Sequence, residues 1–460
     1  MTKRKTENSL DNNLLSDIGN AKRLISKYGF KLQYCKEWKS WLHYEKGRWK
    51  VDSNDIKITD LAKRTILDIQ KQIMEQASLD SKFLDGHEKL IRHVRTSQSA
   101  RSIENMIKLA RSEPGIPISA ESLDCNKWLL NCCNGTFNLQ NYKFQGHNKK
   151  HLLTTKIPVK YDPDAKCPQW EKFLITTFDD DTELIRYLQK AVGYSLTGDT
   201  GEQCMFIPHG NGANGKSTFI ETIHYMLYSY ARKANSTSFM SSRFDRIRND
   251  LARLKGARFV SAVESNEDNT LDEAIIKQMT GQDTIVARFL YQEEFEFDPT
   301  WKIWLVTNHK PIIKGTDYAI WRRVQLIPFT QTFKGKDKIK NLLYKLRKEL
   351  PGILNWAIEG YRLWRTEGLH PPEIVRYATE EYRKEMDVIE DFIDECCVIE
   401  PEANVMVSAL YSRYQRYCHE NSVKPLSKKK FGIELNNKAI ENNRVDKERD
   451  GYRRYGIRLV

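Results

Sequence analysis

A glycine-rich segment, GNGANGKST over residues 210–218, has the residue types that bind phosphate. Glycines adopt backbone conformations closed to other residues, and their N–H groups can closely approach an anion. Lys216 would reach the β- and γ-phosphates of a nucleotide, and the Ser217 hydroxyl would bind Mg²⁺. The segment matches the full pattern GxxxxGK[ST]. The residues predicted to form this site are Gly210, Asn211, Gly212, Ala213, Asn214, Gly215, Lys216, Ser217 and Thr218.

The segments on either side of the glycines must hold that site in place. Residues 204–207 form a short apolar run that ends at Pro208, which is typical of a buried strand. Beyond Lys216, apolar residues recur at helical spacing. The start of this helix would add a favourable electrostatic field for phosphate. The pattern therefore predicts strand, loop and helix in that order.

Hydrolysis also needs an acidic group near the phosphates, and a second apolar run supplies one. Residues 259–263 are mostly apolar, and Glu264 follows them directly. Glu264 could hold a metal-bound water or polarise the attacking water. Glu267 and Asp268 lie close enough in sequence to compete for the second role. An ordinary strand with a solvated acidic end is the alternative.

Two later strands carry polar residues at their ends. An apolar run ends at Asn308, whose side chain could orient water against the γ-phosphate. Arg322 and Arg323 precede another apolar run and could supply an arginine finger, although paired arginines are also a common surface feature. Neighbouring side chains of an extended chain alternate in direction. We therefore expect one arginine to reach a nucleotide and the other to pair with an acid such as Asp317.

An inserted hairpin is predicted between the acidic strand and the strand of Asn308. Residues 271–283 have the spacing of an amphipathic helix, and two alternating runs follow around Gln292 and Glu293. The residues expected to share a face are Ile285, Ala287, Phe289 and Tyr291 in the first run and Phe295 and Phe297 in the second. We expect this insertion to contact a partner.

The C-terminal segment predicts helices followed by a hairpin. Its expected helices span 388–397, 407–420 and 427–438, and its expected strands span 442–446 and 452–459. Basic residues gather on the last helix and the hairpin, as is typical of a winged helix-turn-helix. The domains expected for the whole chain are 1–165, 166–202, 203–335, 336–385 and 386–460.

The composition indicates a polyanionic partner and no membrane. The chain has 74 Lys and Arg against 61 Asp and Glu, a net charge of +13, which favours nucleic acid as the partner. The nine cysteines have no CxxC spacing, which predicts reduced thiols and no zinc site in a cytoplasmic protein. No apolar run reaches membrane-spanning length, and the first residues lack the pattern of a secretory signal.

The order of these motifs resembles that of superfamily 3 helicases. The motifs are GxxxxGKS, an apolar strand with Glu, KQxTGxD, a strand with Asn, and IWRR followed by IPF. More narrowly, the chain is similar to the primase-helicase family of phages, plasmids and large DNA viruses. The similarity also covers residues 17–29, 134–139, 160–174 and 193–200 and the C-terminal segment.

The resemblance implies an α/β fold with a P-loop (AAA+-like) NTPase core and an inserted β-hairpin. A mixed α+β N-terminal domain would precede this core, and a helical segment and a winged-helix domain would follow it. The implied activity is that of a hexameric ring, driven by ATP with Mg²⁺, that moves on single-stranded DNA, usually 3′ to 5′. The expected partners are single-stranded and duplex DNA, further copies of the chain, and a separate primase or polymerase.

The resemblance also implies roles for single residues. Lys216 and Ser217 would contact phosphate and Mg²⁺, Glu264 would share the Mg²⁺, and Asn308 would be the phosphate sensor. The finger that enters the neighbouring subunit's site would be Arg322 or Arg323. Matches to the family's DNA-facing hairpin motif are Lys277, Thr280, Gly281, Asp283 and Arg288. The C-terminal residues expected to contact DNA are Lys428, Lys429, Lys430, Arg453 and Arg454.

Two departures from the family pattern change the expectations. Family-like sequence begins near residue 17, so we expect no primase polymerase domain and no primer synthesis. The hairpin turn has Gln292 and Glu293 but no basic residue, and glutamate repels the DNA backbone. DNA contact is therefore expected from Lys277, Arg288 or a neighbouring loop.

The function expected from the sequence is a replicative DNA helicase of a mobile genetic element. One alternative is an origin-binding initiator that uses ATP mainly for assembly, and another is a nucleotide or small-molecule kinase. A kinase would need neither the hairpin nor the basic C-terminal segment. The set of Glu264, Asn308 and paired arginines favours hydrolysis over assembly alone.

Overall fold

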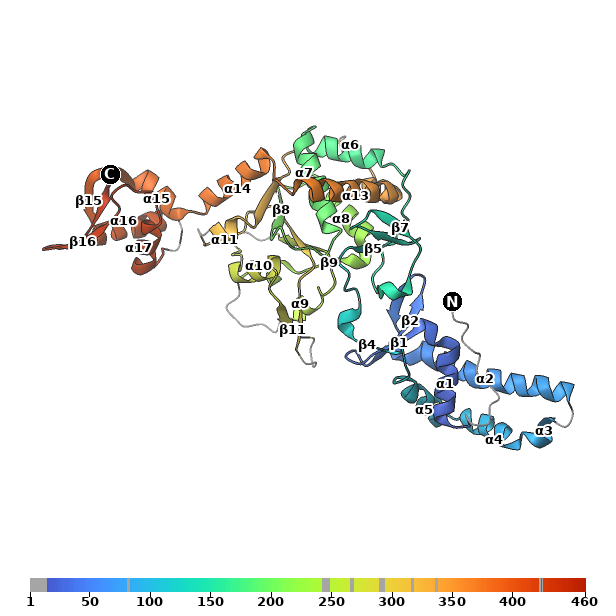
Figure 1. Cartoon of the computed structure of the whole chain (residues 1–460). Coiled ribbons are helices and arrows are strands. Elements are labelled where there is room, and N and C mark those ends of the chain that lie inside the picture. The colour runs from blue at the N-terminus through green and yellow to red at the C-terminus, as the bar shows by residue number, and fades with distance from the viewer. Residues whose placement is uncertain are drawn as a thin grey trace.

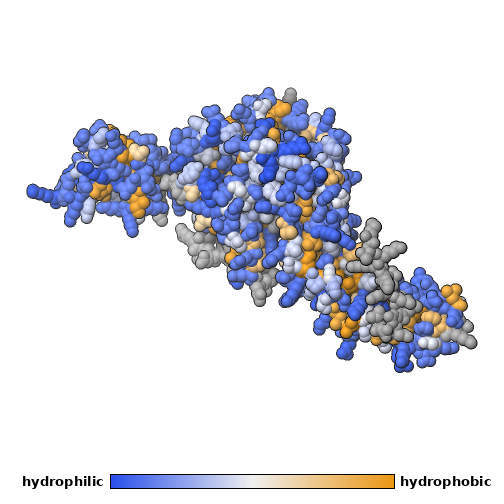
Figure 2. All heavy atoms as spheres, viewed as in Figure 1, coloured by the Kyte–Doolittle hydropathy of each residue, from blue (hydrophilic) through white to orange (hydrophobic). Residues whose placement is uncertain are grey.

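The computed structural model describes residues 15–80, 83–241, 249–264, 269–288, 294–315, 318–335, 338–421, 423 and 425–460. Figure 1 shows an N-terminal unit, a central body and a C-terminal unit, one after another. Hydrophilic residues predominate on the face shown in Figure 2. None of the helices within the described ranges combines the length and the apolar character that crossing a lipid bilayer requires.

The N-terminal unit packs helices against a small sheet. Its helices are α1 (Asp17–Tyr28), α2 (Ile56–Leu79), α3 (Phe83–Gly86), α4 (Glu88–Ser97) and α5 (Ala100–Ala110). Its sheet has the order β3-β2-β1-β4, with β1 (Leu32–Cys35), β2 (Ser40–Glu45), β3 (Arg48–Val51) and β4 (Pro117–Ile118). The apolar core between helices and sheet includes Leu24, Trp41 and Met106, which are fully buried.

The central body is built on a five-stranded parallel sheet of order β14-β8-β13-β10-β9. The strands are β8 (Met205–His209), β9 (Ala231–Lys233), β10 (Phe259–Glu264), β13 (Lys302–Thr307) and β14 (Val324–Pro328). Side chains alternate between the two faces, so Trp304 lies in one apolar core and Ile303 in the other. Both faces are covered, which explains why every residue of β13 is buried.

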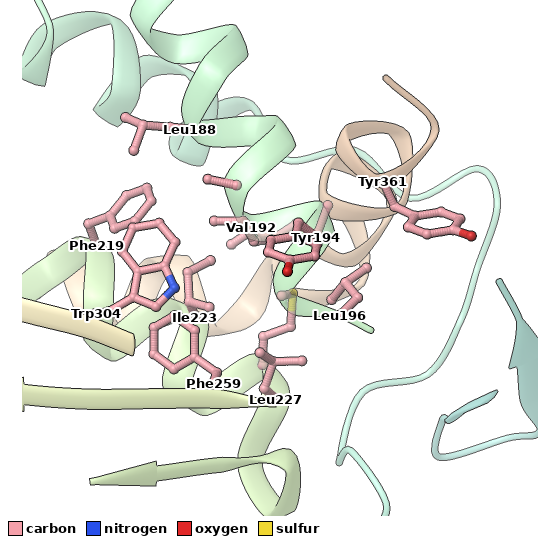
Figure 3. Packing of buried hydrophobic residues seen from close by; sticks show 14 of the residues in the cluster. Leu188, Val192, Tyr194, Leu196, Phe219, Ile223, Leu227, Phe259, Trp304 and Tyr361 are labelled. Carbon is pink, nitrogen blue, oxygen red and sulfur yellow. The ribbon is translucent and has the colours of Figure 1, made fainter. Parts of the chain in front are cut away.

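Helices cover both faces of this sheet. On one face lie α6 (Pro168–Thr177), α7 (Thr182–Ser195), α8 (Lys216–Leu227), α12 (Leu342–Lys348) and α13 (Leu350–Glu367). Figure 3 shows this core, in which Val192, Phe219 and Trp304 come from α7, α8 and β13. The other face packs against α9 (Asn249–Ala252), α10 (Glu273–Thr280), α11 (Tyr318–Trp321) and α14 (Glu373–Glu385).

Two glycines allow α7 and α13 to touch backbone to backbone. A Cβ atom on Gly360 would lie 1.9 Å from the Gln189 carbonyl oxygen, and one on Gly193 would lie 2.0 Å from the Tyr361 nitrogen. Any larger residue at either position would force the helices apart. This close crossing holds the helical layer over the first core.

A three-stranded sheet joins the N-terminal unit to the central body. It consists of β5 (Leu129–Asn131), β6 (Thr136–Asn138) and β7 (Lys143–Gln145). Leu130 and Phe137 share the core of α7, α8 and α13. The domain boundary expected near residue 165 thus does not coincide with a boundary between hydrophobic cores.

The predicted hairpin is confirmed in its described part. Strands β11 (Ile285–Ala287) and β12 (Phe295–Phe297) pair antiparallel. Ile285, Ala287 and Phe297 are buried, whereas Val286 is exposed, as the alternation predicts. Residues 289–293, which include Phe289, Tyr291 and the turn residues Gln292 and Glu293, lie outside the described residues.

The C-terminal unit has three helices and a three-stranded sheet. Its elements are α15 (Val388–Cys396), β15 (Cys397–Met406), α16 (Val407–Glu420), α17 (Lys428–Asn436), β16 (Val445–Glu448) and β17 (Gly451–Leu459). The three helices and the hairpin were predicted, although β16 begins three residues later than expected, and β15, which pairs with β17, was not predicted. Its pairing shifts register between Ile399 and Asn404, around Pro401, and a proline is tolerated in a strand at such a bulge.

Candidate functional site

The glycine-rich loop joins β8 to α8, and its glycines have the backbone geometry that the motif predicts. Gly210 and Gly215 have φ values of +156° and +88°, which L side chains rarely adopt. A Cβ atom on Gly210 would also lie 2.3 Å from the Phe329 carbonyl oxygen. The predicted strand, loop and helix are therefore confirmed, and α8 begins at Lys216.

Lys216 is held in the loop by hydrogen bonds to its own neighbours. Its side chain is 4% exposed, and Nζ donates to the Gly210 carbonyl oxygen and, at 3.1 Å, to Asn214 Oδ1. The Asn214 amide in turn donates to the Phe329 carbonyl at 3.2 Å, which ties the loop to the end of β14. Burial lowers the pKa of Lys216 to about 8. An anion that approached Nζ would favour its charged form.

The acidic strand and the sensor strand end beside this loop. Glu264 pairs in register with Thr307, and Thr307 pairs with His209, the residue before Gly210. Because the three strands are parallel, their carboxyl ends meet at one edge of the sheet. Glu264 is 3% exposed, and Asn308, directly after Thr307, is exposed. Glu267 and Asp268, the competitors of Glu264, lie outside the described residues.

One pocket of about 460 Å³ brings these residues together. The loop from Gly212 to Thr218, Glu264 and Asn308 all line it. Its remaining walls come from segments that the motifs did not indicate. These are Phe173, Thr176 and Thr177 of α6, and Phe333, Ile339 and Leu342 after the sheet. The main chain of Phe333 donates to the Ala213 carbonyl at 2.8 Å, so this wall is bound to the loop.

The two arginines lie at the amino-terminal ends of the strands, opposite the ends that carry the loop, Glu264 and Asn308. They directly precede β14, whose first residue Val324 pairs with Met205, the first residue of β8. β8 has five residues, so roughly 16 Å of strand separates them from the loop. Arg322 is exposed and donates to Gln203 Oε1 at 2.7 Å, whereas Arg323 is buried and donates to the Ala319 carbonyl. Their environments thus differ, and Asp317, the acid expected to pair with one of them, lies outside the described residues.

The residues of the hairpin motif lie on the far side of the second core. Lys277 is half-buried on α10, and Arg288 follows β11 directly. Thr280 is buried and donates to the Ile276 carbonyl at 2.6 Å, so it stabilises the end of α10. Lys277 and Arg288 do not line the pocket. They belong to a different surface from the glycine-rich loop.

The C-terminal cations fall into two groups. Lys428, Lys429 and Lys430 are exposed in the first turn of α17. The Arg453 guanidinium lies 2.7 Å from Asp450 and 3.2 Å from Glu448 and also donates to Asn404, so its charge is offset within the hairpin.

The expectation that Arg454 contacts DNA is wrong. Its side chain is 3% exposed and donates to Asn436 Oδ1 at 2.7 Å, to the Gly432 carbonyl at 3.3 Å and to Asn443 Oδ1. These bonds join α17 to the hairpin. Arg454 is therefore a structural residue, because alternate residues of β17 face the core and Arg454 lies on the inner side.

Three family models match successive parts of the chain. "D5 N terminal like" matches residues 21–179, "Family of unknown function (DUF5906)" matches 209–323, and "Poxvirus D5 protein-like" matches 384–454. A putative helicase of Acanthamoeba polyphaga mimivirus is 26% identical over 443 residues, which cover 87% of this chain. By these matches the chain is similar to the primase-helicase proteins of large DNA viruses.

Two further viral proteins are similar to the chain at the same level of identity. A putative helicase of Frog virus 3 is 27% identical over 54% of this chain, and a putative primase of African swine fever virus is 25% identical over 70%. The matches cover 45%, 28% and 36% of the mimivirus, Frog virus 3 and African swine fever virus proteins, so the chain spans less than half of each relative.

A solved structure shares the fold. The apo structure of the NrS-1 C-terminal region aligns with a TM-score of 0.51 and 10% sequence identity. The alignment covers 96% of this chain and 99% of that one. The mixed α/β architecture with a parallel sheet therefore occurs in a solved protein of nearly the same extent.

The buried lysine gives a direct test of the pocket. Anion binding at Lys216 should weaken as pH rises from 7 to 9, because the pKa near 8 leaves the amine increasingly neutral above pH 8. The loss for pyrophosphate should approach about tenfold per pH unit above pH 8. Isothermal titration calorimetry of the wild type and Lys216→Arg measures it.

The arginine variant stays charged over this range. Its pH profile therefore reflects the titration of pyrophosphate itself. The difference between the pH profiles of the two proteins gives the contribution of Lys216. Identical pH profiles in both proteins would contradict the assignment.

Proposed function

We propose that the chain is the ATP-driven motor of a DNA helicase that acts in replication of a virus or another mobile genetic element. The observation that carries this proposal is the convergence of the glycine-rich loop, Glu264 and Asn308 on one pocket. Similarity to viral proteins supports the replication role, because relatives in large DNA viruses are named putative helicases and primases.

The sheet supports a P-loop core of the AAA+-like type. β8, which leads into the loop, lies between β14 and β13, and β13 separates it from the acidic strand β10. One strand, β13, therefore separates the strand that leads to Lys216 from the strand that ends at Glu264, and Asn308 directly follows β13. A polar side chain is thereby positioned between the phosphate-binding loop and the acid.

ATP fits the pocket by its chemistry. The apolar wall of Phe173, Phe333, Ile339 and Leu342 suits a base, while the loop N–H groups and Lys216 suit the phosphates. The Ser217 hydroxyl and the Glu264 carboxylate are the oxygen ligands that Mg²⁺ prefers, and both line the pocket. These two residues would hold Mg²⁺, which would neutralise phosphate charge. Asn308 would orient the attacking water, and Glu264 would accept its proton.

Replacement of Lys216 distinguishes a role in ATP hydrolysis from a role in folding. Lys216→Ala should abolish ATP hydrolysis, because it removes the cation in the phosphate loop, while the melting temperature should change little. Glu264→Gln should retain ATP binding but lose hydrolysis, since the amide cannot accept a proton. ATPase assays with and without single-stranded DNA, and strand displacement on duplexes with a 3′ or a 5′ tail, measure both.

Three other results would point elsewhere. Near-wild-type turnover by Lys216→Ala would refute the nucleotide site. A rate of ATP hydrolysis that single-stranded DNA does not change would indicate a kinase-like enzyme. Hydrolysis without strand displacement would favour the origin-binding initiator.

Arg322 is the finger in this proposal, and it acts on the next subunit of a ring. It is exposed and lies at the sheet edge opposite its own pocket, so it cannot serve that pocket. Arg323 is buried and donates to the Ala319 carbonyl, so its role in this proposal is to position α11. A hexamer would place each Arg322 beside a neighbour's phosphates.

Mixed subunits test this action in trans. Arg322→Ala should lower hydrolysis by about 10³- to 10⁵-fold while ATP binding persists, because the phosphate loop is intact. Mixing it with Lys216→Ala should restore some activity, since some interfaces combine an intact loop with an intact finger. ATPase rates across mixing ratios measure the effect. Lack of recovery, with subunit exchange shown by fluorescence transfer, would mean that Arg322 acts in cis or has no catalytic role.

The C-terminal unit is a winged helix that binds duplex DNA in this proposal. Its order of helix, strand, two helices and hairpin supports that fold. Lys428, Lys429 and Lys430 lie in the first turn of α17, where the helix dipole disfavours positive charge. Such a local conflict is expected where a residue serves binding rather than stability. Phosphates on the DNA would offset the three charges, and Lys277 and Arg288 would face single-stranded DNA.

The three lysines predict a salt-dependent interaction. Their combined change to alanine should reduce duplex affinity and lower the slope of log affinity against log salt by about 0.9 for each phosphate that a lysine neutralises. Fluorescence anisotropy of a labelled duplex at several salt concentrations measures this. The matched control replaces Lys57, Lys63 and Lys89, which are exposed on the N-terminal unit. If both triple variants lost the same duplex affinity, the loss would follow from net charge and would contradict a specific contact by α17.

A further inference from the structure

The N-terminal unit contains a pocket that the motor does not use. It has a volume of about 490 Å³ and lies between the end of α1, the loop around Gly115 and the turn at 149–151. Ile25, Trp49 and Ile116 line it with apolar surface. Sites for small organic groups have volumes of about 300–1,000 Å³. The pocket can therefore admit a group of the size of a nucleoside.

An aromatic ring close to two cations forms the rim of this pocket. Phe30 is 54% exposed, and its ring centroid lies 5.3 Å from Lys149 Nζ and 5.7 Å from Lys31 Nζ. Lys149 Nζ also donates to the Phe30 carbonyl at 2.8 Å, and Trp49 Nε1 donates to the Lys149 carbonyl at 2.9 Å. These bonds give the rim a defined shape before any ligand arrives.

The charges of the pocket have one sign. Lys149 and Lys150 line it, and none of the described lining residues carries a carboxylate. Exposed aromatic rings beside a positive groove are the features on which successive bases of a single strand stack while the phosphates meet cations. A duplex offers no free base face to Phe30, because its bases are stacked inside the helix. The combination therefore favours a single strand.

We propose that this pocket binds single-stranded DNA, with one base against Phe30 and the apolar floor and adjacent phosphates at Lys149 and Lys150. The proposed function supplies the identity of the polymer, and the site itself rests on the N-terminal unit. Exposed cation–π contacts are weak, so the two ammonium groups can exchange the ring for phosphate. The N-terminal unit would thus contact the strand at a point outside the motor.

Binding of a fluorescein-labelled oligothymidylate to the full chain without ATP tests the proposal. Phe30→Ala should weaken binding by about tenfold, whereas Phe30→Tyr, which keeps a ring, should stay close to the wild type. Lys150→Ala should lower the salt slope by about 0.7, the value for one phosphate of a single strand that is no longer neutralised. Lys63→Ala, an exposed lysine on α2, is the matched control. Affinity unchanged in both Phe30→Ala and Lys150→Ala overturns the proposal.

Photocrosslinking locates the contact. An oligonucleotide with 5-iodouracil should crosslink to the peptide that contains Phe30, and mass spectrometry identifies that peptide. Failure of this crosslink overturns the proposal, as does full competition by thymidine monophosphate at the same nucleotide concentration, which would mark a site for free nucleotides.

Basal ATP hydrolysis should be normal in all of these variants, because the pocket lies outside the motor. A chain that binds DNA through Phe30 but hydrolyses no ATP would refute the proposed function alone. Normal ATP hydrolysis together with a DNA affinity that Phe30→Ala does not change would refute this inference alone.

Discussion

The parallel register of β8, β13 and β10 is the constraint on which the candidate site depends. Pairing of His209 with Thr307 and of Thr307 with Glu264 brings three strand ends to one edge of the sheet. The glycine-rich loop, Asn308 and Glu264 come from positions almost a hundred residues apart, and only this register makes them neighbours. A shift of one residue would also turn each strand's side chains to the opposite face.

The register is held by burial on both faces and by two cations at the other end of the strands. Lys302 Nζ donates to the Asp199 carbonyl at 3.1 Å, and Arg258 donates to the carbonyls of Leu196 and Leu129 at 2.6 and 2.8 Å. Burial lowers the pKa of both side chains, because desolvation disfavours their charged forms. They bind the sheet to the segment that follows α7 and to β5.

The individual elements of the sheet were predictable because each has a local pattern. The strand before the loop, the alternation in β11 and β12, and the helices of the C-terminal unit all follow from periodicity and were confirmed. β15 was not predicted, because Pro401 and the bulge around it interrupt the alternation that marks a strand. Arg454 was assigned to DNA for its charge, and its burial against α17 depends on contacts that the local sequence does not show.

The sequence by itself indicated which residues are chemically able to hold phosphate and metal, because glycine, lysine and serine at this spacing have few other uses, and Glu264 directly follows an apolar run. It also determined the local strand–loop–helix, since hydrophobic periodicity acts over a few residues. Only the tertiary structure decided that Phe173 and Phe333 complete the pocket, that Arg322 is exposed while Arg323 is buried, and that the Phe30 ring lies close to Lys149 as well as Lys31. The reason is that burial and contact between distant segments arise from packing, to which every part of the chain contributes at once.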